Sequence, residues 1–247
     1  MFSNTCSKIG NRLVVRPDNS VKIVPFEIIA PKNGEVLVET VSTLISAGTE
    51  LGSQEQGRTH DLKPGYSNTG RIIALGDQVE GFSLGDRVLS KGSHASHVTV
   101  STSPQSLVKL PDEVSFDHGA YGVLGSVSMH GIRKACIEIG EFAVITGMGL
   151  VGQLAVQLAA KSGCEILVAV DLVVERLEIS ECNGATHILN FNQRDLQTEI
   201  VAITEGRGID VVVEASGYPD VLPALFDMSR VGGRIMLLGS IWHRKVE

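Results

Sequence analysis

Three glycines at the spacing G-x-G-x-x-G form the clearest chemistry-bearing pattern in the sequence. The pattern follows the apolar run Phe142–Thr146 and opens a second apolar stretch. In that context the three glycines allow a tight turn, close approach of a phosphate to the backbone, and close packing of helix on strand. Free N–H groups at such a helix start bind phosphate. The six residues are Gly147, Met148, Gly149, Leu150, Val151 and Gly152.

An acid at the end of the next apolar run completes a dinucleotide pattern. Asp171 follows Ile166–Val170 and stands close to the expected distance of roughly 20 residues from the first glycine. Its carboxylate can bind the adenosine ribose hydroxyls and would repel a 2′-phosphate, so NAD is the predicted cofactor. NADP is the alternative, because Arg176 is near. Ser216 and Gly239, after the fourth and fifth strands, complete the predicted cofactor-binding set.

Other interpretations of this pattern are weaker. The glycines could form only a turn and Asp171 could cap only a helix, but the order of strand, glycine loop, helix, strand and acid favours a nucleotide site. A flavin or S-adenosyl-methionine site can share the pattern. The β-rich segment that precedes it argues against both.

Two patterns of secondary structure predict two domains. Residues 1–120 contain short β-branched runs separated by turn residues, which predicts an antiparallel barrel or sandwich. Residues 121–247 begin with one or two helices and then alternate strands and helices, which predicts a doubly wound parallel sheet. Strand runs that are apolar throughout indicate burial on both faces. The predicted strands are Phe142–Thr146, Glu165–Asp171, His187–Asn190, Ile209–Ala215 and Arg234–Gly239.

Composition excludes several classes of partner. With 21 Lys and Arg against 28 Asp and Glu, the net charge is -7, which disfavours nucleic acid and anionic membranes. No apolar run approaches the ~20 residues that span a bilayer. The cysteines are scattered without a C-x-x-C pair, which is typical of reduced thiols and predicts a cytoplasmic protein. The expected partner is a small-molecule substrate. The cysteines are Cys6, Cys136, Cys164 and Cys182.

The sequence resembles the medium-chain dehydrogenase/reductase superfamily over nearly its whole length. Gly85–Val88 matches the family's G-D-R-V, and Gly147–Gly152 with Asp171 matches its Rossmann half. The resemblance implies a GroES-like β-barrel domain followed by a Rossmann domain. The strings Leu44–Glu50, Pro64–Gly70 and His130–Arg133 are similar to the dehydrogenase half of bi-domain oxidoreductases and to the bacteriochlorophyllide dehydrogenase group.

The resemblance also implies where a catalytic zinc would bind, and the sequence departs there. The first ligand position carries Ala47, the second carries Tyr66, and residues 120–129 contain no Cys, Asp or Glu. A catalytic zinc needs about three protein ligands, so none is expected. His94 and His97 are the best remaining metal candidates, but surface or turn histidines are the favoured interpretation. A zinc alcohol dehydrogenase with unusual ligands stays as an alternative.

Without a metal, hydroxyl donors must stabilise charge on the substrate oxygen during hydride transfer. By resemblance, Thr49 occupies the family's proton-relay position and Tyr66 replaces the zinc-binding histidine. Glu50 is a structural or catalytic candidate, and His130 is either catalytic or simply hydrogen-bonded on a helix. Tyr66 has its own alternative, an aromatic side chain packed between domains.

The resemblance further implies that the Rossmann sheet lacks its last strand and is C-terminally truncated. The predicted function is an NAD(P)-dependent oxidoreductase acting on an alcohol, carbonyl or enone. A truncated remnant that binds nucleotide without turnover is the second hypothesis. An exposed apolar edge near Ile235–Leu238 would promote association. Full-length relatives are expected to be homo-oligomers.

Overall fold

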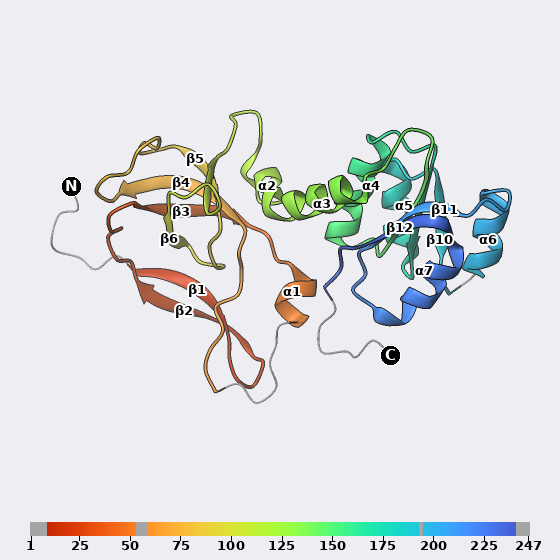
Figure 1. Ribbon diagram of the computed structural model, residues 1–247. Helices are drawn as coiled ribbons and strands as arrows, with labels where there is room; N and C mark the ends of the chain where they lie inside the picture. The colour runs from red at the N-terminus through yellow and green to blue at the C-terminus, as the bar shows by residue number, and fades with distance from the viewer. Residues whose placement is uncertain (1–8, 53–58, 193–194, 241–247) are drawn as a thin grey trace. The chain divides into compact units, whose positions relative to one another are not determined.

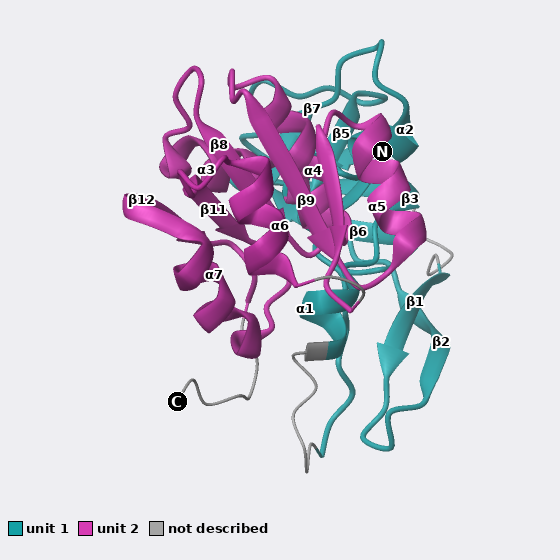
Figure 2. Cartoon of the chain, turned by 90° about the vertical axis from the view of Figure 1, so that its right-hand side faces the viewer, with its two compact units in different colours: residues 1–123 teal, residues 124–247 magenta. Residues whose placement is uncertain are grey.

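The computed structural model describes residues 9–52, 59–192 and 195–240. The chain divides into two compact units, residues 1–123 and 124–247 (Figure 2). Each unit has its own sheet (Figure 1). Of the helices that the structure describes, none has the length and hydropathy needed to cross a membrane. The predicted fold class, an antiparallel β domain joined to a Rossmann-type parallel sheet, is confirmed.

Unit 1 is built from an antiparallel sheet that curls into half of a barrel, with a separate hairpin of β1 and β2. The strand order of the sheet is β6-β3-β4-β5-β7. Alternating side chains such as Val36, Val38 and Ile72 fill its core. The strands are β1 (Ile9–Val15), β2 (Val21–Glu27), β3 (Glu35–Thr43), β4 (Asn68–Leu75), β5 (Arg87–Ser90), β6 (His97–Ser101) and β7 (Leu107–Lys109).

Two short helices interrupt the β structure of unit 1. Helix α1 (Ala47–Gly52) follows β3 directly, and α2 (Phe116–Gly119) follows β7. The Ser115 side chain caps α2 by accepting the N–H of His118. Sequence patterns did not predict α1, because six residues are too few for a helical period of apolar side chains.

Unit 2 is a parallel sheet covered on both faces by helices. Its strand order, β10-β9-β8-β11-β12, places the first and fourth strands side by side. In such sheets this is the crossing point where ligands bind. The strands are β8 (Phe142–Thr146), β9 (Ile166–Asp171), β10 (His187–Asn190), β11 (Ile209–Glu214) and β12 (Ser229–Leu237). The helices are α3 (Gly122–Ala135, which begins at the end of unit 1), α4 (Leu150–Ala160), α5 (Val174–Cys182), α6 (Leu196–Ile203), the 3-10 turn Pro219–Val221 and α7 (Leu222–Met228).

Two apolar clusters, one on each face, hold unit 2 together. Ile145 and Val213 point to one cluster, whereas Val144 and Val212 point to the other. This alternation within β8 and β11 explains why both runs are apolar throughout. The predicted strands of this unit agree with the structure except the last, which begins at Ser229. Gly232 lies inside β12, where the register of β12 on β11 shifts.

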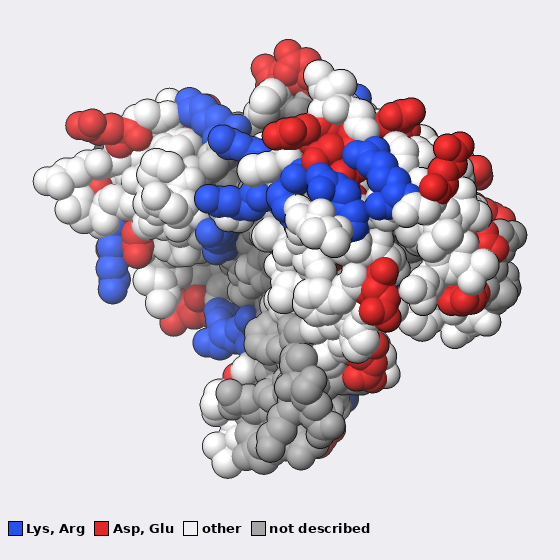
Figure 3. All heavy atoms as spheres, turned by 45° about the vertical axis from the view of Figure 1, so that its right-hand side comes forward, with Lys and Arg blue, Asp and Glu red and all other residues white. Residues whose placement is uncertain are grey.

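Buried ion pairs fix the end of the sheet where β8 and β11 begin. Asp210 is fully buried and binds Arg207 and Arg230. Burial by itself would raise the pKa of Asp210, but the Phe142 N–H, Arg230 and the charge of Arg207 lower it below its ordinary value. The Arg234 guanidinium likewise counteracts burial and lowers the pKa of Glu141. On the face drawn in Figure 3, Lys and Arg side chains gather beside acidic side chains.

Candidate functional site

The predicted site residues fall into two sets, one in each unit. Thr49, Glu50 and Tyr66 belong to unit 1. His130 and all predicted cofactor-binding residues belong to unit 2. Each set is described within its own unit.

The glycine loop connects β8 to α4. Gly147 has φ +87°, and a Cβ there would lie 2.6 Å from Ser216. A Cβ on Gly152 would lie 1.8 Å from the Gly147 carbonyl oxygen, so helix and loop are in direct contact. At Gly149, by contrast, a Cβ would meet nothing within 4 Å. The loop therefore needs two of its glycines for its own packing, while the third faces open space.

The N-terminus of α4 supplies the donors that a phosphate needs. Gly149 is its N-cap residue and makes no side-chain hydrogen bond, and Leu150 and Val151 form the first turn. The first N–H groups of a helix have no intrahelical acceptor, and the helix dipole adds partial positive charge there. An open glycine next to these donors fits a pyrophosphate.

Asp171 ends β9 beside the glycine loop. Its carboxylate accepts the Met148 N–H at 2.5 Å and the Val173 N–H at 2.9 Å. It therefore links the loop to the start of α5 and remains partly exposed. Arg176 is exposed on α5, and its backbone carbonyl accepts a hydrogen bond from Gln153. The structure thus brings Asp171 to the loop, as the sequence order predicted.

Glu214 ends β11 and was not predicted from sequence. Its side chain is 1% exposed, and its carboxylate accepts N–H groups of Ser216 at 2.6 Å and of Gly217 at 3.0 Å. The Ser216 hydroxyl donates to it as well. A Cβ on Gly239 would lie 2.7 Å from Glu214 Oε2 and 2.4 Å from Gly217 N. The turns after β11 and β12 therefore meet at this carboxylate. The available signal was a lone acid ending an apolar strand, as at Asp171.

In unit 1, His94 lies in a bend before β6. Of the expected surface or turn histidine, the structure shows the turn but not the surface, because His94 is only 6% exposed. Its Nδ1 lies 2.7 Å from Thr43 Oγ1 and its Nε2 lies 2.9 Å from Glu50 Oε2. Both partners are more than 40 positions away in the sequence. No local pattern could have signalled these contacts.

Glu50 connects His94 to the helix that carries Thr49. Its other oxygen accepts the Ser46 N–H at 2.8 Å, which fixes the entry to α1. The Ser46 hydroxyl lies 3.5 Å from Thr49 Oγ1, at the limit of a hydrogen bond. A helix of six residues has little stability alone, so the position of Thr49 depends on the Glu50–His94 contact.

Tyr66 stands next to the same histidine. Gly65 has φ +100°, and a Cβ there would lie 2.5 Å from His94 N and 2.8 Å from its ring. The imidazole thus packs on the backbone immediately before Tyr66. Among the described residues the Tyr66 hydroxyl has no hydrogen-bond partner, and the side chain is partly exposed. Its phenol is free to donate to a ligand.

His130 lies on the exposed surface of α3 in unit 2. It lies on a helix, as expected, and this position leaves both alternatives, a catalytic and a simply hydrogen-bonded histidine, open. His97, paired with His94 as a metal candidate, contacts Ser96 and Glu39 instead of the Thr43 and Glu50 partners of His94. The two histidines therefore do not share a set of partners.

The residues present do not fit a catalytic zinc. In the described part of the chain, no three His, Cys, Asp or Glu side chains gather as metal ligands would. The nearest arrangement, His94 with Glu50, has both ring nitrogens engaged by protein atoms. Three protein ligands are the usual requirement.

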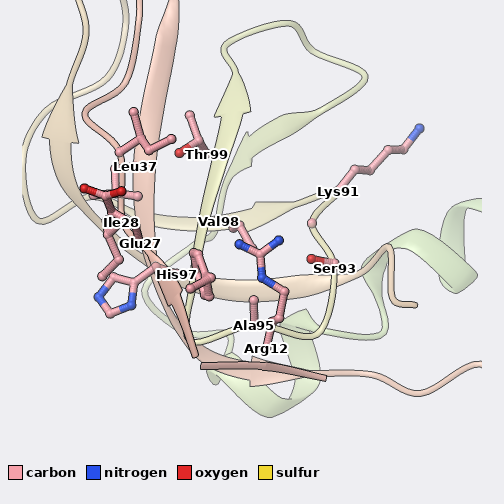
Figure 4. A pocket seen from close by; sticks show the side chains of 13 residues that line it. Arg12, Glu27, Ile28, Leu37, Lys91, Ser93, Ala95, His97, Val98 and Thr99 are labelled. Carbon is pink, nitrogen blue, oxygen red and sulfur yellow. The ribbon is translucent and has the colours of Figure 1, made fainter. Parts of the chain in front are cut away.

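A hollow of about 330 Å³ in unit 1 includes His97 and both sequence neighbours of His94 in its lining, but not Thr49, Glu50 or Tyr66 (Figure 4). Arg12, stacked 3.7 Å above the Phe26 ring, lines it together with Lys91 and His97. None of the predicted catalytic or cofactor-binding residues contributes to its lining. It is therefore not the candidate site.

Comparison with known proteins shows similarity to dehydrogenases. A family model described as zinc-binding dehydrogenase matches residues 151–247. D-guloside 3-dehydrogenase of Escherichia coli strain K12 is 32% identical over 167 residues, which cover 67% of this chain and 48% of that protein. Sorbitol dehydrogenase of Bacillus subtilis strain 168 is 27% identical over 263 residues, covering 92% and 74%.

The fold is also found among solved structures. An oxidoreductase/dehydrogenase of unknown specificity from Escherichia coli matches with a TM-score of 0.86 at 22% identity, covering 95% of this chain and 78% of that one. A likeness at this identity shows a shared fold. The chain spans about half the length of the D-guloside 3-dehydrogenase that it matches.

The contacts of His94 predict an asymmetric effect of two substitutions. His94→Ala leaves the Glu50 carboxylate buried without its ring partner and should lower the free energy of unfolding by about 1–3 kcal/mol. His94→Gln can still donate to Glu50 and should recover at least half of that loss. Thermal or urea unfolding measures both. Equal stability of the alanine variant and the parent protein would contradict the structural role given to this contact.

Proposed function

Because the chain belongs to the medium-chain dehydrogenase/reductase superfamily, we propose that it acts as an NAD(P)-dependent oxidoreductase. It transfers a hydride between a nicotinamide cofactor and an organic alcohol, carbonyl or enone. The observation that carries this proposal is the glycine loop between β8 and α4. Of the three glycines of its motif, Gly149 is the one that faces open space, and it lies beside the first N–H groups of α4. A bound nicotinamide dinucleotide supplies or accepts the hydride, and the chain's residues bind it and handle the oxygen and proton.

The strand order supports a specific orientation of the dinucleotide. The glycine loop follows the central strand β8, and Asp171 ends the neighbouring strand β9. With the pyrophosphate at the loop and the adenosine ribose at Asp171, the nicotinamide half extends toward β11 and β12. Ser216 and Gly239 follow those two strands and line that half of the site.

The substrate oxygen requires a donor in the proposed site. When a carbonyl accepts a hydride at carbon, its oxygen becomes an alkoxide and takes up a proton. We assign stabilisation of this oxygen to the Tyr66 phenol and the Thr49 hydroxyl, which Glu50 holds in place through α1. His130, in unit 2, is a separate candidate donor. Neutral hydroxyl donors replace the Lewis acid used by zinc-containing relatives.

A nucleotide-binding protein without turnover is the second candidate function. The departures at Ala47 and Tyr66 from the family's zinc ligands favour it. The two are separated by following nicotinamide absorbance while candidate substrates are added. Polyols, sugar-derived secondary alcohols and their ketones form the first panel, because the names of the relatives point to such substrates. Binding with no turnover across the panel favours the second candidate.

The glycine loop gives a matched pair of variants for the cofactor site. Gly149→Ala meets no neighbouring atom and has φ -75°, so it should keep the parent melting temperature. It should weaken the binding of NADH at least tenfold, because the new methyl group occupies the space through which the pyrophosphate reaches the backbone. Gly152→Ala forces its Cβ onto the Gly147 carbonyl oxygen and should cost about 1–3 kcal/mol of stability. Fluorescence titration and thermal unfolding measure both. Unchanged NADH affinity in a folded Gly149→Ala protein would refute the loop as the cofactor site.

Asp171 should determine the preference for NAD over NADP. Asp171→Ala removes the predicted acceptor for the ribose hydroxyls, so NADH affinity should fall about tenfold or more, whereas NADPH affinity should change little or improve. Asp171 also accepts the Met148 N–H, so Asp171→Asn, which keeps an acceptor oxygen, controls for disturbance of the loop. An equal loss for both cofactors in both variants would show that Asp171 is only structural.

We also propose that the protein works without stoichiometric zinc. Ala47 and Tyr66 stand where relatives carry zinc ligands, and the described residues form no set of three metal ligands. Elemental analysis of protein purified without chelator should therefore find well under one zinc per chain. One equivalent that survives dialysis would reverse this proposal and would direct attention to His94 and Glu50.

A further inference from the structure

We propose that the buried carboxylate of Glu214 makes the nicotinamide end of the site prefer the oxidised cofactor, so that bound NADH is a stronger hydride donor than free NADH. This inference rests on the proposed nicotinamide site. The hydride transfer proposed for this site gives Glu214 no role.

The environment of Glu214 is that of a carboxylate without a cation. The N–H groups of Ser216 and Gly217 and the Ser216 hydroxyl donate hydrogen bonds to its oxygens. Within the described residues no Lys or Arg pairs with it. An acceptor-only arrangement is the one that an ionised carboxyl group makes. Burial of such a charge without a counter-ion is costly.

The same strand carries a buried carboxylate of the opposite kind. Asp210, near the start of β11, is fully buried and binds both Arg207 and Arg230. Its charge is therefore neutralised within the protein. Among the described residues, Glu214, at the other end of β11, is compensated by dipoles and by no cation. One strand thus carries a paired charge at one end and an unpaired charge at the end where ligands bind in such sheets.

Glu214 lies on the side of the sheet toward which the nicotinamide extends. The order β9, β8, β11 and β12 places Asp171 and Glu214 on opposite sides of the glycine loop. The turns that Glu214 holds, at Gly217 and Gly239, are those that line the nicotinamide half. The oxidised ring carries one positive charge that the reduced ring lacks. A nearby unpaired carboxylate therefore stabilises the oxidised form selectively.

Selective binding of one cofactor form changes the equilibrium between the two bound forms, because binding and reaction equilibria are linked. If the site binds NAD⁺ more tightly than NADH, the equilibrium between bound forms shifts toward NAD⁺ by the same factor. Reduction of a carbonyl consumes NADH and a proton and yields the alcohol and NAD⁺. A site with this preference therefore favours the reductive direction relative to free cofactors.

The test compares the affinities of three ligands for the parent chain and two variants. NAD⁺, NADH and ADP-ribose are titrated by calorimetry, since ADP-ribose lacks the nicotinamide ring. Glu214→Gln removes the charge and nearly conserves the shape. It should weaken the binding of NAD⁺ about five- to tenfold relative to NADH, the size expected for a unit charge about 12–17 Å from the ring at an effective dielectric of about 20. ADP-ribose affinity should stay within about twofold.

Asp210→Asn is the matched control, because it also removes a buried negative charge from β11. It should leave the ratio of NAD⁺ to NADH affinity unchanged. An unchanged ratio in Glu214→Gln overturns the inference, and so does an equal loss for all three ligands, which marks a purely structural role. If Glu214→Gln does not fold, the parent chain decides: tighter binding of NAD⁺ than of NADH supports the inference, and the reverse order overturns it. Failure of the parent chain to bind any of the three refutes the proposed function itself.

Discussion

The burial of both faces of the parallel sheet is the constraint on which unit 2 depends. Strands β8, β9 and β11 lie between two apolar clusters, so polar groups have no place along their middle. Polar side chains therefore appear where the strands end, and those at the carboxyl ends stand at one edge of the sheet. They are Thr146, Asp171, Asn190 and Glu214. Three of these side chains bind backbone N–H or C=O groups of the neighbouring turns, as buried polar groups generally do. Thr146 Oγ1 is the exception, because it has no hydrogen-bond partner among the described residues.

Unit 1 depends on a different device, one buried side chain at the meeting point of several loops. The backbone of His94 binds Leu13 and Pro64, and its ring joins Thr43 to Glu50. Thr43 also donates to the Ser67 carbonyl. Because a threonine has one hydroxyl proton, it can satisfy either Ser67 or a neutral ring at Nδ1. When it donates to Ser67, its oxygen accepts from the ring at Nδ1. The orientation of the Thr43 hydroxyl and the tautomer of the ring are thus set together.

The extent of sequence-based prediction follows from the range of the interactions involved. The glycine loop, the helix after it and Asp171 were predictable, because strand, turn and helix signals occur in order along one βαβ segment. The five strands of the sheet were predictable from their unbroken apolar runs. Helix α1 was not, because six residues show no period, and the early start of β12 was hidden by the two glycines of its bulge. His94 carried no signal of its own, and Glu214 carried only that of a lone acid at the end of an apolar strand, because burial of a polar residue depends on partners that only the folded chain brings near.

The chemistry proposed for the two units agrees on one direction. Carbonyl reduction needs a hydride donor and a group that stabilises the forming alkoxide. A neutral phenol such as that of Tyr66 can donate a hydrogen bond to an alkoxide, but a neutral phenol is a poor base for removing a proton from an alcohol. A metal ion would serve both directions, since it stabilises an alkoxide whichever way that alkoxide forms. Hydroxyl donors in place of a metal can stabilise the alkoxide that carbonyl reduction forms. The Glu214 carboxylate, which we propose to act on the nicotinamide end, acts in the same direction, because it favours the cofactor form that reduction produces.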